Sequence, residues 1–337
     1  MVTRIGINGF GRIGRLTFRA MKKYHPNELE VVAINDLADT PTNAHLLKHD
    51  TNYGAYPGTV EAGEGFITVD GRMVKAFSEK EPNKIQWRDY GVDIVIESTG
   101  RFSDRDKAAL HLGGGAKKVI ISTTSSNADL TVVMGVNQKM YKPSQHVVIS
   151  NASCTTNCVT PMTKVIFDKF GIEKALINTV HAYTNDQSLL DIYHKDLRRA
   201  RAAALNIIPT TTGAAKAVAQ VIPELKGLIH GISLRVPVGS VSIADLTAIV
   251  KRKVTAEEVN AALEAAADGE LKGIMSFCEE ELVSSDFRGD PASCIIDAAS
   301  TMVMDGNMVK ILGWYDNEWG YSTRLGDLAA YIGAQGL

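Results

Sequence analysis

The first half of the chain alternates short apolar runs with a segment of helical spacing. Residues 3–8 and 29–34 are short runs of strand length that are rich in isoleucine and valine, whereas residues 15–24 carry apolar side chains three and four positions apart. Glycines punctuate residues 9–14, between the first run and the helical segment. This order predicts a strand, a tight turn, a helix and a second strand, which together form a βαβ unit.

Further elements of the same type follow up to residue 150. One helix is predicted over residues 103–112, and its spacing from the neighbouring apolar runs suits a crossover between parallel strands. Four buried strands are predicted, at residues 93–97, 118–122, 131–134 and 147–150. The first half is therefore expected to be an α/β domain.

Longer strands separated by few helices are predicted after Pro161, which indicates an antiparallel α+β domain. The strands are expected at residues 176–183, 228–236, 242–251 and 308–315. Residues 255–268 form a clear amphipathic helix, and residues 327–336 are expected to return as a terminal helix that packs on the first domain. We place the domains at residues 1–150, completed by residues 317–337, and at residues 151–316.

Charge and composition exclude several functional classes. The 36 basic and 38 acidic residues leave a formal net charge of -2, so no broad field attracts nucleic acid or anionic lipid. No apolar run reaches the ~18 residues of a membrane span, and no signal peptide is recognisable at the N-terminus. We expect a cytoplasmic protein with no nucleic-acid or membrane partner.

The four cysteines are too few for a disulfide framework and suit a reducing compartment. Cys154 and Cys158 lack the second pair of ligands that a structural zinc site requires. No metal site is predicted, and thiol chemistry remains available.

The pattern Gly9-Phe10-Gly11-Arg12-Ile13-Gly14 follows a predicted strand and precedes a helix, which is the setting of a dinucleotide-binding turn. Asp36 ends the second strand, where a carboxylate can accept hydrogen bonds from a ribose 2′-hydroxyl and repel a 2′-phosphate. NAD is thus the expected cofactor, and Asp36 disfavours NADP. The alternative is that the glycines only form turns and Asp36 only caps a loop.

A thiol and an imidazole are the candidate catalytic pair. Cys154 lies where a strand passes into a helix, and the partial positive charge of a helix N-terminus is expected to lower its pKa. His181 comes directly after residues 176–180 of the predicted strand and is the best candidate base among eight histidines. The alternatives are a buried, inert cysteine and a histidine that serves only as a polar surface residue.

Groups that bind anions are spread over the second domain. They are Thr184, Arg199, Arg235 and the threonine-rich turn at residues 210–213, which leads into a helix. Two phosphates could be held by such a set. The open alternative is that the arginines form a solvated or subunit-facing surface and that the threonines only cap a helix.

From end to end, the chain resembles phosphorylating glyceraldehyde-3-phosphate dehydrogenase of the bacterial type. The segments that carry the resemblance are residues 7–15, 150–158, 181–187, 194–201, 211–217 and 314–321. The resemblance implies an α/β Rossmann dinucleotide-binding domain, an α+β catalytic domain with a large, mostly antiparallel sheet, and a homotetramer.

The resemblance also assigns roles to single residues. Cys154 would be the nucleophile and His181 its base. The remaining positions are Gly9, Gly11, Arg12, Ile13, Gly14, Asp36, Lys80, Ser122 and Asn317 for NAD, Thr184 and Arg235 for the substrate phosphate, Ser153, Thr155, Thr212 and Gly213 for inorganic phosphate, and Arg199 between the two phosphates.

The implied reaction is the oxidation of glyceraldehyde 3-phosphate through a thiohemiacetal and a thioester on Cys154, with release by inorganic phosphate. Its alternatives are erythrose-4-phosphate dehydrogenase, which releases the thioester with water, and a non-catalytic nucleotide-binding redox sensor. The chain departs from the family's common pattern at Thr123-Thr124, Ile192-Tyr193 and Val238-Gly239, near the expected cofactor and phosphate positions.

Overall fold

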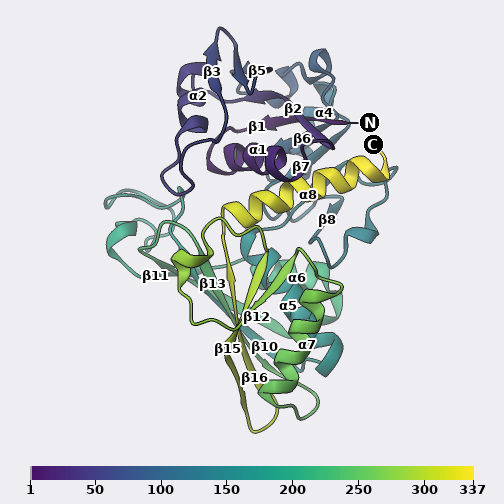
Figure 1. Ribbon diagram of the computed structural model, residues 1–337, viewed down its shortest axis with the longest axis vertical. Helices are drawn as coiled ribbons and strands as arrows, with labels where there is room; N and C mark the ends of the chain where they lie inside the picture. The colour runs from purple at the N-terminus through teal and green to yellow at the C-terminus, as the bar shows by residue number, and fades with distance from the viewer. Residues whose placement is uncertain (1) are drawn as a thin grey trace. The chain divides into compact units, whose positions relative to one another are not determined.

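The computed structural model describes residues 2–337 and divides into two compact units (Figure 1). Met1–Ala152 and Ser322–Leu337 form the first unit, and Ser153–Tyr321 form the second. Within residues 2–337, no helix is long and apolar enough to cross a membrane. Each unit is built on one sheet.

The first unit contains a nine-stranded sheet. Across the seven strands that run in space from β5 (Arg72–Phe77) to β8 (Leu130–Thr131), each strand is parallel to its neighbour. A hairpin-like edge of two antiparallel strands, β3 and β4, extends it beyond β5. In spatial order the strands are β3 (Val60–Gly63), β4 (Phe66–Val69), β5 (Arg72–Phe77), β2 (Leu29–Asn35), β1 (Thr3–Asn8), β6 (Ile94–Glu97), β7 (Lys118–Ile121), β9 (Val148–Ser150) and β8 (Leu130–Thr131). This parallel, doubly wound arrangement places the carboxyl ends of β1, β2 and β6 side by side, at the edge where such sheets bind ligands.

The helices of the first unit are mostly short. They are α1 (Arg12–Tyr24), α2 (Thr40–Lys48), α3 (Arg105–Ala108), α4 (Leu110–Gly113) and the 3₁₀ helices η1 (Pro82–Lys84), η2 (Trp87–Tyr90) and η3 (Gln138–Met140). Helix α8 (Trp319–Gln335), yellow in Figure 1, contributes its later residues to this unit. There Asp327 contacts His25 Nε2 at 2.6 Å, and Gly333 lies so close to Thr3 that a Cβ would clash with its hydroxyl.

The second unit contains a seven-stranded sheet that is mostly antiparallel. In spatial order its strands are β11 (Ile208–Thr211), β12 (Ile229–Val236), β10 (Lys174–Ala182), β13 (Ser242–Ile249), β16 (Met308–Tyr315), β15 (Cys294–Met304) and β14 (Met275–Cys278). Only the pairs β10 with β12 and β14 with β15 are parallel.

Three helices pack on this sheet, namely α5 (Cys154–Phe170), α6 (Ala214–Val221) and α7 (Ala256–Asp268). Short 3₁₀ helices η4 (Ala203–Leu205), η5 (Pro223–Leu225) and η6 (Ser284–Phe287) complete the unit. Helix α7 begins with a capping box, in which Thr255 and Glu258 each bond the other's backbone. Along β13 and β16 buried residues alternate with half-exposed ones, so one face of the sheet meets the helices and the other remains partly open.

The predicted fold class is confirmed, since a mainly parallel α/β sheet precedes a mostly antiparallel one. Three predicted elements differ clearly in extent. The terminal helix, expected at residues 327–336, begins at Trp319. The strand expected at residues 131–134 is only Leu130–Thr131, because the chain turns away after Thr131. The helix expected over residues 103–112 is interrupted at Ala109, which separates α3 from α4. Beyond it the backbone hydrogen bonds span three residues instead of four, as from the Leu112 amide to the Ala109 carbonyl.

Candidate active site

A cavity of about 280 Å³ opens at the carboxyl ends of the first unit's parallel strands. Four of the residues predicted to bind a nucleotide lie in its wall, namely Gly9, Gly11, Asp36 and Lys80. The other eight were not predicted from the sequence, and they are Asn8, Asn35, Leu37, Glu79, Ser98, Thr99, Arg101 and Phe102. Those residues end a strand or follow one, and their place near the carboxyl ends of the predicted strands is the signal that could have found them.

The three glycines of the turn meet different surroundings. Gly9 has φ +88°, and a Cβ there would lie 2.6 Å from the Thr99 amide nitrogen. A Cβ on Gly14 would lie 2.2 Å from the Gly9 carbonyl oxygen, so this position requires glycine for helix packing. A Cβ on Gly11 would meet nothing within 4 Å. The open space at Gly11 is what close approach of a pyrophosphate requires.

Asp36 ties the glycine turn to the end of β2. Its Oδ2 accepts a hydrogen bond from the Phe10 amide at 2.8 Å, and its Oδ1 accepts one from the Ala38 amide at 3.0 Å. Each carboxylate oxygen can accept a further hydrogen bond. Asp36 therefore orients the turn and still offers acceptors in the cavity wall.

The other predicted cofactor residues lie outside this wall. Arg12 pairs with Asp50 at 2.5 Å, Ile13 is half-buried on the same helix, and the Ser122 amide donates to the Glu97 carbonyl. Asn317 belongs to the second unit, where its side-chain oxygen accepts a hydrogen bond from Ser242 at 2.9 Å. The predicted set is thus divided between the two units.

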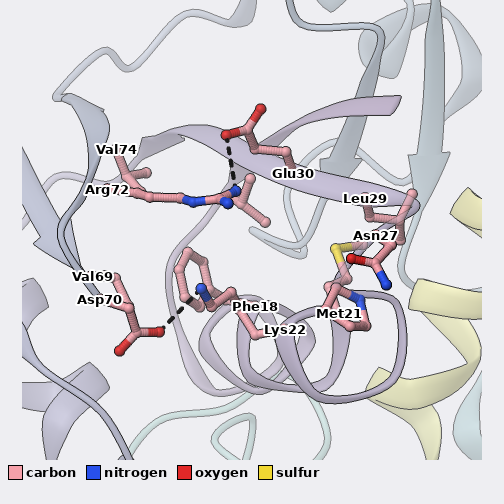
Figure 2. A pocket seen from close by; sticks show the side chains of 12 residues that line it. Phe18, Met21, Lys22, Asn27, Leu29, Glu30, Val69, Asp70, Arg72 and Val74 are labelled. Carbon is pink, nitrogen blue, oxygen red and sulfur yellow. Dashed lines mark hydrogen bonds and ion pairs between the residues drawn. The ribbon is translucent and has the colours of Figure 1, made fainter. Parts of the chain in front are cut away.

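A second cavity of about 360 Å³ lies between α1 and the tip of the β4–β5 hairpin (Figure 2). Its floor is apolar, with Phe18 and Met21 among the residues that line it. The charged groups at its rim are already paired, Lys22 with Asp70 at 3.0 Å and Arg72 with Glu30. It contains no predicted site residue, and its charges compensate one another.

In the second unit, Cys154 and His181 are brought together from two elements. Cys154 is the first residue of α5, and the Ser153 hydroxyl caps this helix by accepting from the Thr156 amide at 3.1 Å. His181 is the penultimate residue of β10, which lies between β12 and β13. The Cys154 Sγ and His181 Nε2 atoms are 3.4 Å apart, within reach of proton transfer.

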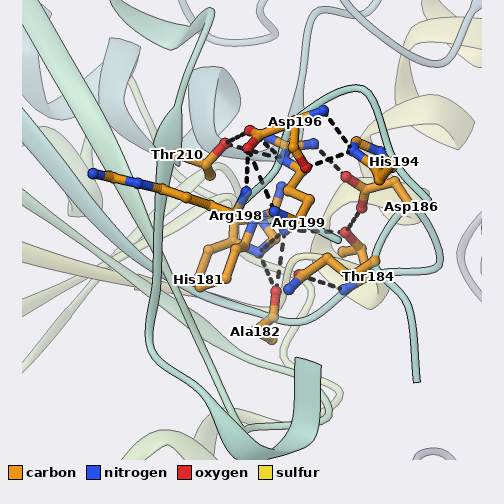
Figure 3. Close-up of polar contacts among 11 residues, drawn as sticks. His181, Ala182, Thr184, Asp186, His194, Asp196, Arg198, Arg199 and Thr210 are labelled. Carbon is orange, nitrogen blue, oxygen red and sulfur yellow. Dashed lines mark hydrogen bonds and ion pairs between the residues drawn. The ribbon is translucent and has the colours of Figure 1, made fainter. Parts of the chain in front are cut away.

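The surroundings of His181 define its tautomer. Its Nδ1 lies 2.6 Å from the Ala182 carbonyl oxygen and 2.8 Å from Arg235 Nη1 (Figure 3 shows the first of these neighbours). The two hydrogens of Arg235 Nη1 have oxygen acceptors at 3.1 Å, on Ala182 and Thr184. We therefore assign the proton to Nδ1, which donates to Ala182 and leaves Nε2 free to accept a proton from Cys154.

Burial determines the charge of both groups. It lowers the pKa of His181 to about 3, and the nearby Arg235 contributes to this lowering, so the imidazole is neutral at neutral pH. Burial also raises the pKa of the Cys154 thiol, although Arg235 and the helix amides oppose the rise. The expectation that the helix N-terminus lowers this pKa was wrong in net direction, because loss of solvation outweighs the lowering by the helix amides.

Positive groups gather beside the pair. Arg235 donates to the Thr184 hydroxyl at 3.1 Å, and Arg199 donates from Nε to the Thr210 hydroxyl at 3.0 Å. Asp186 contacts both Arg199 and Thr184, as Figure 3 shows. A carboxylate of the chain itself therefore neutralises part of the charge that an anionic ligand would meet.

The remaining predicted phosphate residues lie near helix N-termini. Thr212 Oγ1 accepts from the Ala214 amide at 3.2 Å, and Gly213 precedes α6. The Thr155 hydroxyl contacts the buried Tyr315 hydroxyl at 2.9 Å, so its side chain is engaged inside the unit. Among residues 2–337, no group of three or more His, Cys, Asp or Glu side chains is arranged to hold a metal ion.

The ionisation of Cys154 should depend on Arg235. Because the arginine's charge lowers the pKa of the thiol, Arg235→Leu should raise that pKa. The midpoint of Cys154 alkylation by iodoacetamide should then move to higher pH. It is measured between about pH 7 and pH 10, where His181 stays neutral throughout.

Peptide mass spectrometry would separate modification of Cys154 from that of Cys278, which is also partly exposed. Arg198→Leu is the matched control. It also removes one positive charge, but Arg198 is exposed and contacts the Pro209 carbonyl, whereas Arg235 contacts His181. An unchanged or lower midpoint in Arg235→Leu would contradict the assigned role of this charge.

Comparisons with known proteins agree with the two-unit architecture. The family model described as "Glyceraldehyde 3-phosphate dehydrogenase, NAD binding domain" matches residues 3–105, and the corresponding C-terminal domain model matches residues 153–317.

The chain is 58% identical to glyceraldehyde-3-phosphate dehydrogenase 1 of Bacillus cereus over 336 residues, with 100% of both chains covered. It is also 58% identical to the Geobacillus stearothermophilus enzyme of that name over 337 residues, with 100% of both chains covered. For glyceraldehyde-3-phosphate dehydrogenase 2 of Streptomyces avermitilis the identity is 59% over 335 residues, with 99% of this chain and 100% of the relative covered. The chain therefore belongs to the glyceraldehyde-3-phosphate dehydrogenase family and is an oxidoreductase with an NAD binding domain.

Proposed function

We propose that this protein oxidises D-glyceraldehyde 3-phosphate with NAD and inorganic phosphate to 1,3-bisphosphoglycerate, as a glycolytic and gluconeogenic enzyme of the cytoplasm. The observation that carries the proposal is the contact of 3.4 Å between the Cys154 thiol and a neutral imidazole, beside Arg235. The names of the full-length relatives support the substrate. The comparisons give no such support to erythrose-4-phosphate oxidation or to a non-catalytic redox sensor.

The residues of the first unit fit NAD. The space at Gly11 admits a pyrophosphate, the N-terminus of α1 favours negative charge there, and Asp36 offers acceptors for a ribose. We assign Gly9, Gly11, Arg12, Ile13, Gly14, Asp36, Lys80 and Ser122 of the first unit to cofactor binding, and also Asn317 of the second unit. NAD, when bound, supplies the acceptor for the hydride that leaves the substrate.

The Cys154 side chain performs the covalent step. His181 Nε2 accepts the thiol proton as Sγ bonds to the aldehyde carbon, which gives a thiohemiacetal. The negative charge that develops on the former carbonyl oxygen is stabilised by the amides at the start of α5. His181 returns its proton to this oxygen, which gives the neutral thiohemiacetal hydroxyl. As the carbon loses its hydride, His181 takes the hydroxyl proton back, the C=O bond re-forms, and an acyl thioester remains on Cys154.

The anion-binding groups hold the two phosphates. We assign Thr184 and Arg235 to the substrate's C3 phosphate, and Ser153, Thr155, Thr212 and Gly213 to inorganic phosphate, with Arg199 between them. Entry of a dianion would compete with Asp186 for Arg199 and Thr184. Attack by a phosphate oxygen on the thioester carbon breaks the C–S bond, releases the acyl phosphate and returns the thiolate to Cys154.

We further propose that the protein is a homotetramer. The segment at residues 183–207 exposes large apolar side chains, of which Tyr193 is 92% exposed and Leu189 81%. The face of the second sheet that the helices leave open also carries apolar residues, such as Leu176 at 64% exposed. Apolar surface of this extent is typical of subunit contacts.

Turnover should require inorganic phosphate. NADH formation from glyceraldehyde 3-phosphate is expected to continue in steady state only when phosphate or arsenate is present, because the thioester needs that nucleophile. Initial rates of NADH formation, followed by absorbance with and without each anion, test this. Cys154→Ser is the matched variant, and it should retain NAD binding but lose steady turnover. Equal rates without either anion would reject release by phosphate.

Two glycine substitutions should separate cofactor binding from folding. Gly11→Ala adds its Cβ to open space, so the variant should fold with unchanged thermal stability but bind NAD more weakly. Gly14→Ala places its Cβ 2.2 Å from the Gly9 carbonyl oxygen and should lower the unfolding temperature. Calorimetric titration with NAD and thermal unfolding of both variants measure the difference. If Gly11→Ala binds NAD as tightly as the wild type, the pyrophosphate does not approach Gly11.

A further inference from the structure

Glu97 is a buried carboxylate that none of the roles above uses. It is the last residue of β6, it is only 2% exposed, and it lies at the carboxyl edge of the first sheet. A buried carboxylate without partners is costly, so its contacts determine whether it is stabilised. No lysine or arginine forms an ion pair with it among residues 2–337.

Four donors surround its two oxygens. Oε2 accepts from Asn8 Nδ2 at 2.6 Å and from His111 Nε2 at 3.0 Å. Oε1 accepts from the Thr99 amide at 2.8 Å and from the Thr99 hydroxyl. Because every neighbouring polar group donates, the side chain acts only as an acceptor, as an ionised carboxylate does.

The tautomer of His111 follows from Trp87. The Trp87 indole, which can only donate, lies 3.1 Å from His111 Nδ1, so Nδ1 is the acceptor and the ring hydrogen is on Nε2. That hydrogen points to Glu97 rather than to the Asn8 amide, which lies 3.3 Å from Nε2 and is itself a donor. A neutral imidazole therefore faces Glu97, and the pair retains one negative charge.

The contacts continue into the nucleotide cavity. Asn8 Oδ1 accepts from Asn35 Nδ2 at 2.7 Å, and the Asn35 side-chain amide bonds the backbone N–H and carbonyl of Glu79, at 2.8 and 2.9 Å. Asn8, Asn35, Glu79 and Thr99 all line the cavity. One carboxylate thus connects, directly or through Asn8, the ends of β1, β2 and β6 and the segment after β5.

We propose that Glu97 is a positioning residue for NAD: its acceptor-only carboxylate sets the orientation of the Asn8 amide and of the Thr99 turn, and thereby the shape of the cavity wall. This inference rests on the proposed NAD site. Glu97 touches no reacting atom, so it should affect cofactor affinity and leave the chemistry on Cys154 unchanged.

Glu97→Gln tests the donor and acceptor pattern with almost no change in volume. A glutamine can still accept from Thr99, but its amide hydrogens would face the Asn8 amide and His111 Nε2. If Asn8 turned its oxygen toward the glutamine, its bond from Asn35 would be lost. The loss of a matching donor and acceptor at Glu97 would therefore also disturb Asn8 and Asn35, which line the cavity.

The expected result is a dissociation constant for NAD raised about tenfold, because a buried hydrogen-bond mismatch has an effect of this order. The turnover number at saturating NAD and the KM for the aldehyde should stay within about twofold. Calorimetric titration of the full-length protein gives the dissociation constant for NAD, and initial rates give the turnover number and the KM for the aldehyde.

A second substitution should restore the pattern. In the double variant Asn8→Asp/Glu97→Gln, the carboxylate introduced at position 8 can accept both from the amide introduced at position 97 and from Asn35, so NAD affinity should return toward the wild-type value. Asn8→Asp alone places two carboxylates together and should weaken NAD binding.

The control for simple destabilisation is Val95→Ala. Val95 lies on the same strand as Glu97, in a buried apolar cluster. It should lower the unfolding temperature and leave NAD affinity unchanged.

The outcomes distinguish the two proposals. If the wild type binds no NAD, the proposed function fails. If the wild type binds NAD and Glu97→Gln binds it equally well, or Val95→Ala weakens binding as much, the positioning role alone is overturned. If Glu97→Gln does not fold, the double variant decides, since a folded double variant with weak NAD binding would also overturn the role.

Discussion

The contact between Cys154 Sγ and His181 Nε2 is the interaction on which the proposed chemistry depends. It requires α5 to begin beside the end of β10, and the sheet order β12-β10-β13 holds that strand end in place. Burial keeps His181 neutral by lowering its pKa to about 3, and it also raises the pKa of Cys154. The pair is therefore held as thiol and free base, and in the proposed mechanism the thiolate forms as its proton passes to the imidazole.

Both sites control charge by arranging neutral donors or paired groups. At the thiol, Arg235 contacts Thr184 and His181, and Arg199 is paired with Asp186. At the nucleotide cavity, Glu97 is stabilised by amides, a hydroxyl and a neutral imidazole without a cation. Fixed dipoles of this type orient ligands without moving when they bind, which is the basis of preorganisation.

Sequence patterns predicted those features whose signals are local. The turn from Gly9 to Gly14 and the strands at residues 3–8 and 176–183 have such signals. The resemblance to a known family then added expected roles for single residues. The edge strands β3 and β4 were missed because they are only partly buried, whereas β6 and β7, also four residues long, are buried throughout. The role of Glu97 was not visible because its partners Asn8 and His111 are distant in the chain, and the direction of the Cys154 pKa was wrong because solvation depends on tertiary packing.

The central claim is that the substrate becomes covalently attached to Cys154. The most direct measurement is peptide mass spectrometry of the protein quenched with acid after mixing with glyceraldehyde 3-phosphate and NAD in the absence of phosphate. We predict a phosphoglyceroyl thioester on the peptide that contains Cys154, and its disappearance when inorganic phosphate is added before the quench. NADH formation with no acyl group on Cys154, or with the acyl group on another residue, would contradict this claim.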